Sequence, residues 1–145
     1  MKVMTQLAFD GQCREAFERY ATVLGGRITV MNTFGGHRDK ALPPGSADAG
    51  DDKVRFAELQ IGEQAILGND LPPGQFERMQ GFNVSIHTRD RAEARRIFEG
   101  LVVGGEVHTA LVEVEWAALF GMLTDRFGVP WLILALDEPP GPPRD

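Results

Sequence analysis

Among the side chains of types that carry chemistry, Glu58 is the most promising candidate for a functional role. It shares one face of the strand predicted over residues 53–61 with Phe56 and Gln60, because side chains two apart on a strand point the same way. A carboxylate that borders a pocket can act as a general base or anchor a ligand. A carboxylate that lies in water or beside an arginine has no such role, so both interpretations of Glu58 stay open.

Two aromatic residues could supply the apolar wall of a pocket. Trp116 stands at the entrance of the strand predicted over 117–124, and Phe120 lies inside it. Flat rings bury a ligand well, but pocket walls and core have the same composition. For Trp131, which follows Pro130 in the last predicted strand, a core or dimer contact is the favoured role.

The histidines do not form a recognisable catalytic set. His87 and His108 lie on predicted strands in different halves, with no cysteine or serine partner placed for a nucleophilic triad. His37 with Asp39 and the acidic run over 48–52 could hold a metal from a loop, but the spacing matches no ligand motif. A solvated loop is the favoured interpretation there.

Composition limits the classes of partner. The chain has 145 residues, 43% hydrophobic and 25% charged, with a net charge of −6 and no cluster of basic residues. These values are typical of one folded domain and predict neither nucleic-acid nor membrane binding. The single cysteine, Cys13, cannot form an internal disulfide, and the first residues lack the apolar core of a signal peptide. We therefore expect a cytoplasmic protein.

Periodicity predicts two similar halves. Alternating or β-branched runs indicate strands, and apolar residues at helical spacing indicate a helix in each half. The predicted strands cover 3–9, 27–34, 53–61 and 64–68, then 81–87, 106–113, 117–124 and 130–136; the predicted helices cover 13–24 and 91–103.

Short matches connect these halves at an offset of about 79 residues: Asp10 with Asp90, Glu15–Ala16 with Glu93–Ala94, and Gly25–Gly26 with Gly104–Gly105. The alternative is a chance match of two amphipathic helices that both end in Gly-Gly. The shared strand order favours a duplicated βαβββ module.

We expect one domain over 1–136, with modules at about 1–70 and 80–136. The proline- and glycine-rich tail over 137–145 is expected to be disordered.

Several motifs, in order along the chain, resemble one known family. They are Phe9-Asp10-Gly11 with Cys13 and Glu15-Ala16-Phe17, then Phe56-Ala57-Glu58-Leu59 with Ile61-Gly62, and the specific block from Phe120 to Trp131, FGMLTDRFGVPW. Together they resemble the PhnB-like branch of the glyoxalase, bleomycin-resistance and vicinal oxygen chelate superfamily over about residues 3–136.

The resemblance implies an α+β fold in which two βαβββ modules form a curved, incompletely closed barrel of mixed sheet, with helices outside and a cleft inside, commonly as a homodimer. Members of the superfamily include metal-dependent lyases, isomerases and dioxygenases, and resistance proteins that only bind a drug. Some PhnB-like members carry a 3-demethylubiquinone 3-methyltransferase label. This sequence has no glycine-rich turn after a strand to hold a methyl donor, so we do not expect methyl transfer.

The resemblance also locates the four strand positions that hold the metal in metal-dependent members. Here they fall near Gln6 and at Leu67, Asn83 and Leu132. Leucine offers no lone pair, and an amide binds hard cations weakly, so we expect neither a metal nor another cofactor at this place. Strand parity would bring Glu58 beside Gln6 and Asn83 on the cleft side.

The leading hypothesis is therefore a metal-independent small-molecule-binding protein, with Gln6, Glu58 and Asn83 as polar contacts and Trp116 and Phe120 as walls. An alternative is a metal-dependent lyase, isomerase or dioxygenase with an altered ligand set that includes Gln6 and Glu58. A third is a structural or interaction role through a dimer surface. The sequence leaves open whether the chain is an enzyme and which molecule it binds.

Overall fold

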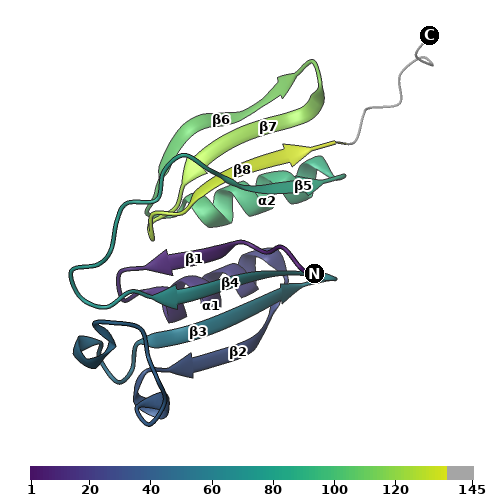
Figure 1. Ribbon diagram of the computed structural model, residues 1–145. Helices are drawn as coiled ribbons and strands as arrows, with labels where there is room; N and C mark the ends of the chain where they lie inside the picture. The colour runs from purple at the N-terminus through teal and green to yellow at the C-terminus, as the bar shows by residue number, and fades with distance from the viewer. Residues whose placement is uncertain (137–145) are drawn as a thin grey trace. The chain divides into compact units, whose positions relative to one another are not determined.

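The computed structural model describes residues 1–136, and the chain divides into two compact units, Met1–Arg78 and a second that begins at Met79. Each unit has one helix and one four-stranded mixed sheet (Figure 1). The C-terminal tail, for which disorder was predicted, lies outside the described residues.

Unit 1 has a sheet of order β1-β4-β3-β2, in which β1 runs parallel to β4 and the other neighbours are antiparallel. Its elements are β1 (Gln6–Phe9), α1 (Cys13–Leu24), β2 (Arg27–Thr33), the 3₁₀ turns η1 (Gly35–His37) and η2 (Ser46–Asp48), β3 (Val54–Ile61) and β4 (Gln64–Asp70).

Unit 2 has the same sheet in the order β5-β8-β7-β6, again with one parallel pair, β5 and β8. Its elements are β5 (Val84–Thr88), α2 (Arg91–Val102), β6 (Glu106–Val114), β7 (Ala117–Thr124) and β8 (Pro130–Ala135). The predicted order of elements is therefore confirmed in both units, and so is the α+β class.

The first strand is shorter than predicted, because β1 begins at Gln6 rather than near Val3. Pairing nevertheless continues one residue further, since the Leu67 amide donates to the Thr5 carbonyl at 2.9 Å. The helix α1 matches its prediction and ends at Gly25, whose φ of +71° suits a residue without a side chain.

Each helix packs on its sheet through a close approach to a glycine. A Cβ built on Gly68 of β4 would lie 2.5 Å from Phe17 Cζ of α1, and one on Gly121 of β7 would lie 2.9 Å from Phe98 Cε2 of α2. Both distances are shorter than any carbon–carbon contact allows. The aromatic ring of the helix therefore fills the space that a side chain on the strand would need.

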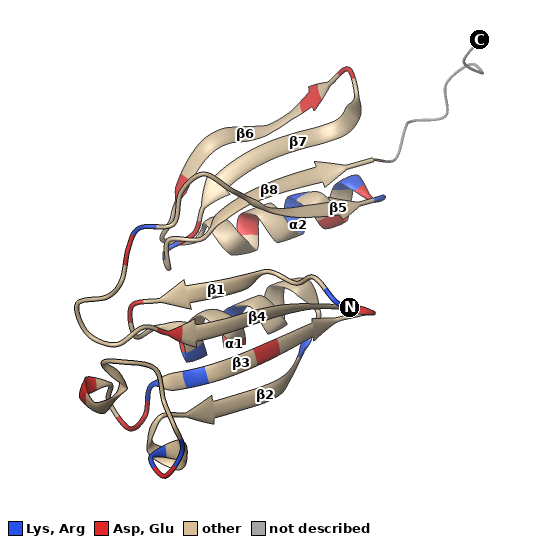
Figure 2. Cartoon of the chain, viewed as in Figure 1, with Lys and Arg blue, Asp and Glu red and all other residues tan. Residues whose placement is uncertain are grey.

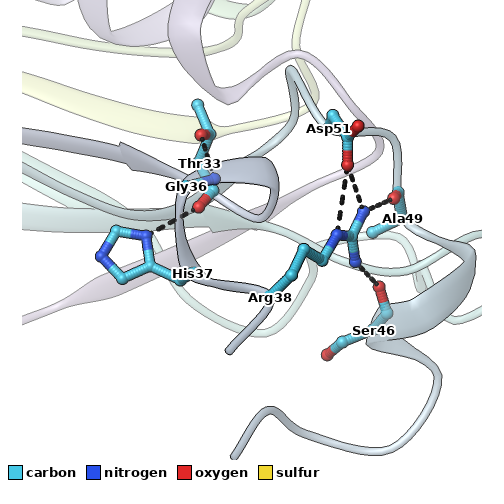
Figure 3. A network of polar contacts seen from close by, with 7 residues as sticks. All are labelled: Thr33, Gly36, His37, Arg38, Ser46, Ala49 and Asp51. Atoms are coloured by element: carbon cyan, nitrogen blue, oxygen red, sulfur yellow. Dashed lines mark hydrogen bonds and ion pairs between the residues drawn. The ribbon is translucent and has the colours of Figure 1, made fainter. Parts of the chain in front are cut away.

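The loop between β2 and β3 is held by Arg38, which extends its guanidinium into the loop (Figure 3). This group donates to the carbonyls of Ser46, at 2.6 Å, and Ala49, and it pairs with Asp51 at 2.9 Å. His37 bonds through Nδ1 to the Thr33 carbonyl at 2.9 Å. His37 and Asp51 therefore have structural partners within this loop.

No helix within residues 1–136 is long and apolar enough to cross a membrane.

Candidate functional site

The sheet of unit 1 has one face covered by α1 and one face that α1 leaves uncovered, which we call the open face of unit 1. Leu7, Ala57 and Gly68 share one cross-strand row on the helix side, where both Leu7 and Ala57 are buried. The adjacent row faces the other way. The open face of unit 1 carries Gln6, Asn32, Phe56, Glu58, Leu67 and Asn69.

Gln6 and Glu58 lie in one row of this face, with Leu67 between them, because Leu67 pairs with both residues. Neighbouring strands are about 4.8 Å apart, so the two polar residues are separated by about 10 Å at the backbone. Gln6 Nε2 donates to Asn69 Oδ1 at 3.0 Å. The structure therefore brings together two of the residues predicted for the site, within one unit and on one face.

Glu58 also lines a groove of about 650 Å³ in unit 1. It is the one acidic residue of β3 (Figure 2). The other lining residues belong to the N-terminal segment and to the hairpin of β3 and β4: Lys2, Val3, Met4, Thr5, Gln60, Glu63, Gln64 and Ala65. The Glu58 carboxylate has no hydrogen bond or ion pair with any described residue.

Asn32 is a residue of this face that the sequence analysis missed. It pairs with Phe56, two residues along β3 from Glu58, so the two polar side chains are diagonal neighbours. Its Oδ1 atom is buried and has no hydrogen-bond partner in the described chain. The sequence signal was weak, because an asparagine in a strand of Ile, Val and Thr residues does not by itself indicate a site.

The equivalent surface of the second sheet, the open face of unit 2, is mainly apolar. Three of its positions correspond by register to polar residues of unit 1: Ser85 to Gln6, Met122 to Glu58, and Leu134 to Asn69. The face carries Ser85, His87, Val112, Phe120, Met122, Leu132 and Leu134. The two sheets thus share a strand order but present different chemistry.

Trp116 and Phe120 contact each other at the end of this face. Their ring centroids are 5.3 Å apart with an interplanar angle of 65°, which is an edge-on contact. Trp116 lies in the turn between β6 and β7, directly before the first residue of β7 as predicted, and 61% of it is exposed. A large exposed indole on a partner ring is a surface that an apolar ligand can cover.

Asn83 lies one residue before β5 and is exposed. It has the same strand parity as Ser85, which pairs with Leu132 as Gln6 pairs with Leu67. In the repeated architecture, Ser85 therefore occupies the position that Gln6 has in unit 1.

His87 has a serine partner after all, since Ser85 Oγ and His87 Nε2 are 2.8 Å apart. The sequence analysis did not predict this contact, although residues two apart on a strand share a face. A nucleophile also needs its base held by a third group, and His87 Nδ1 has no partner in residues 1–136. The pair is therefore not a catalytic triad.

The residues at the positions where the resemblance would place metal ligands do not fit a divalent cation. Leu67 and Leu132 lie on the open faces beside Gln6 and Ser85, and their side chains have no donor atom. Within the described chain, no three His, Cys, Asp or Glu side chains converge on a common point.

Cys13, at the start of α1, is buried, as the packing interpretation predicted. Burial, and secondarily the carboxylate of Asp70, raise the pKa of this thiol far above its usual range. The thiol is therefore protonated at neutral pH and is a poor nucleophile.

Comparison with known protein families assigns this chain to one of them. Residues 1–134 match the model described as 3-demethylubiquinone-9 3-methyltransferase. This chain belongs to that family. The match covers both units and includes every motif on which the PhnB-like resemblance was based.

Two solved structures share the fold of this chain over nearly its whole length. Protein PA1353 from Pseudomonas aeruginosa is 37% identical with a TM-score of 0.84, and the match covers 95% of this chain and 99% of that one. A PhnB protein from Bacillus cereus is 19% identical with a TM-score of 0.77, over 93% and 99% of the two chains.

A third solved structure of low sequence identity has the same fold. A glyoxylase/bleomycin resistance protein/dioxygenase domain from Frankia is 13% identical with a TM-score of 0.65, over 93% of this chain and 96% of that one. At this identity the likeness shows the fold alone. The chain thus has the glyoxalase-like fold that the sequence motifs predicted.

Proposed function

We propose that this chain is a small-molecule-binding protein of the vicinal oxygen chelate fold that works without the usual catalytic metal. The ligand contacts proposed on unit 1 are Gln6 and Glu58, and those on unit 2 are Asn83, Trp116 and Phe120. The two units act together as one domain in a cytoplasmic homodimer. Light scattering that reports a monomer at working concentration would contradict the dimer.

One observation carries this proposal. The open face of each sheet has a leucine, Leu67 or Leu132, where metal-dependent relatives place a donor. The same faces keep the features of a binding surface, which are a groove beside Glu58 and an exposed aromatic pair formed by Trp116 and Phe120. The faces are therefore suited to holding a molecule and poorly suited to holding a cation.

The strand-to-helix turns support binding over methyl transfer, despite the family's description. The turn from β1 to α1 contains one glycine, Gly11, and the turn from β5 to α2 contains none. The first amide of α1, on Cys13, is already bonded to the Asp70 carboxylate at 2.9 Å. Neither turn resembles the glycine-rich turns that bind nucleotides.

Thermal shift tests the proposal with the purified chain. A ligand that binds only the folded state raises the melting temperature. We expect Ni²⁺, Mn²⁺, Fe²⁺ and Zn²⁺ to leave the transition unchanged, and at least one member of a metabolite panel to raise it. Leu67→Glu is the positive control, because it inserts a carboxylate between Gln6 and Glu58 and should produce a metal-dependent shift.

Tightly bound divalent metal in the wild-type protein, lost to a chelator together with ligand binding, would contradict the proposal. That result would favour the metal-dependent lyase, isomerase or dioxygenase in which Gln6 and Glu58 are ligands.

A further inference from the structure

Four apolar residues form an exposed patch at one end of the open face of unit 2, which we call the aromatic patch: Val112, Trp116, Phe120 and Leu136. The exposed fractions are 61% for Trp116, 47% for Val112 and 45% for Leu136. Val112 pairs with Phe120, the ring that the indole contacts edge-on. A group of exposed apolar side chains of this size is typical of a surface that something covers.

The last described residue, Leu136, lies beside the indole. β8 is antiparallel to β7, and its last residue, Ala135, pairs with Leu119. Leu136 is still bonded to the sheet, since its amide donates to the Thr88 carbonyl at 2.8 Å. One further step of the β7–β8 register places Leu136 opposite Ala118. The next residue of the chain therefore follows beside the start of β7, where the indole lies.

The sequence after Leu136 has a composition that aromatic surfaces bind. It reads DEPPGPPRD, with proline pairs at 139–140 and 142–143. Consecutive prolines favour the polyproline II conformation, which leaves little conformational entropy to be lost on binding, and grooves lined by aromatic side chains recognise it. A segment without a core of its own can therefore still be held by an exposed indole.

The reach of the chain selects the first proline pair. Trp116 is one strand away from Leu136 and two residues along, which corresponds to about 8 Å at the backbone. An extended chain advances about 3.3–3.6 Å per residue, so Pro139 and Pro140 are about 10–14 Å of chain beyond Leu136 and can reach the indole. The pair at 142–143 is about 20–25 Å of chain away and extends beyond it.

We propose that the segment 137–145 covers the aromatic patch, with the rings of Pro139 and Pro140 stacked on the Trp116 indole. The contact removes apolar surface from water and orders a segment for which composition alone predicts disorder. It is made within one chain and needs no ligand, so it goes beyond the proposed function. A ligand that uses Trp116 and Phe120 has to displace the segment, and this consequence alone rests on the proposed function.

Tryptophan fluorescence of the full chain tests the contact, because the two tryptophans of the sequence have opposite environments. Trp131 is fully buried, and its Nε1 donates to Asp125 at 2.8 Å, so changes in emission report on Trp116. In Trp116→Phe, the emission that remains should not respond to substitutions in the segment.

Paired proline substitutions separate the contact from general effects of the segment. Pro139→Ser combined with Pro140→Ser should shift the emission to longer wavelength and increase its quenching by acrylamide, because water then reaches the indole. Pro142→Ser combined with Pro143→Ser is the matched control and should leave both unchanged. Both variants keep the length and the charge of the segment.

Two further measurements locate and weigh the contact. The ring protons of Pro139 and Pro140 should move upfield in NMR spectra through the ring current of the indole, and Trp116→Leu should abolish that shift. The dye anilinonaphthalene sulfonate, which binds exposed apolar surface, should bind the variant with serine at 139 and 140 more tightly than the wild type. Equal affinity for the dye would contradict coverage of the patch.

Unchanged emission in the variant at 139–140, or an equal change in the control at 142–143, would overturn the proposal. Wild-type emission that depends on protein concentration and not on the prolines would also overturn it, because a second copy of the chain would then cover the patch. Failure of the proposed function has a different signature: no metabolite raises the melting temperature, while the difference between the two proline variants persists.

Discussion

The two helices of this chain begin in different ways, although they occupy equivalent places in their units. At α2, the Asp90 side chain lies one residue before the helix and accepts from the Ala92 amide at 2.9 Å. At α1, Gln12 provides no side-chain bond, and the Cys13 amide donates instead to Asp70 Oδ1 at 2.9 Å. The first helix is therefore capped by a residue 57 positions away.

Both solutions meet one physical requirement. The first amides of a helix have no partner within the helix, and a carboxylate near them also interacts well with the helix dipole. Asp70 does more than cap, because its Oδ2 accepts from the Val54 amide at 2.8 Å at the start of β3. One buried carboxylate thus connects α1, β3 and β4.

The register between β5 and β8 shows why unit 2 has no carboxylate in the place of Asp70. Asp70 pairs with the last residue of β1, and its equivalent beside the last residue of β5 is Ala135. The buried carboxylate of unit 2 is Asp125, in the turn after β7. It accepts from the amides of Phe127 and Val129 and from Trp131 Nε1 at 2.8 Å. The two units therefore have the same strand order but carry their buried carboxylates, Asp70 and Asp125, at different positions in the fold.

The largest expected effect comes from removing the remote cap. Asp70→Ala leaves the Cys13 and Val54 amides buried without an acceptor, so we expect the free energy of unfolding to fall by about 3 kcal/mol. Chemical denaturation measures the change. Asp70→Asn keeps one acceptor oxygen and should cost less; equal losses would show that the charge, not the pair of hydrogen bonds, carries the stability.

A smaller effect is expected from the two glycines beneath the helices. Gly68→Ala forces a methyl group against Phe17 and should destabilise unit 1 by about 2 kcal/mol, whereas the looser fit at Gly121 predicts about 1 kcal/mol for Gly121→Ala. The melting temperatures of the two variants measure this difference, and we expect Gly68→Ala to melt at the lower temperature. Phe17→Leu in the Gly68→Ala background should recover part of the loss, and an additive loss would contradict the steric cause.

The smallest effect is expected at the local cap. Asp90→Ala removes one exposed hydrogen bond to the start of α2 and should lower the free energy of unfolding by about 1 kcal/mol. Asp90→Ser should restore most of it, because serine is also a good capping residue. A loss as large as that of Asp70→Ala would remove the distinction between local and remote capping.

Much of the fold followed from local patterns. The apolar spacing of Ala16, Phe17, Tyr20 and Val23 predicted α1 with its observed bounds, because a helix buries residues three and four apart. The bounds of β7 were also as predicted. The start of β1 was not, since where a strand begins depends on its partner, and residues 10–63 separate β1 from β4 along the chain.

The candidate site was predictable only in part. Strand parity predicted that Glu58 shares a face with Gln6, and the structure places both in one row with Leu67 between them, because alternation is a local property. Asn32 and the Ser85–His87 contact were missed. An orphaned acceptor exists only where neighbouring strands bury it, and a hydrogen bond between two side chains depends on their rotamers.

The sequence alone determined the order of strands and helices along the chain and the repetition of that order in two halves, because periodicity and residue type need no partner to be recognised. Only the tertiary structure decided that Asp70 caps α1, that Asn32 lacks a donor, and that the two open faces differ in polarity. Each of these depends on the register between strands that are distant in the chain, and register is fixed by packing, not by local propensity.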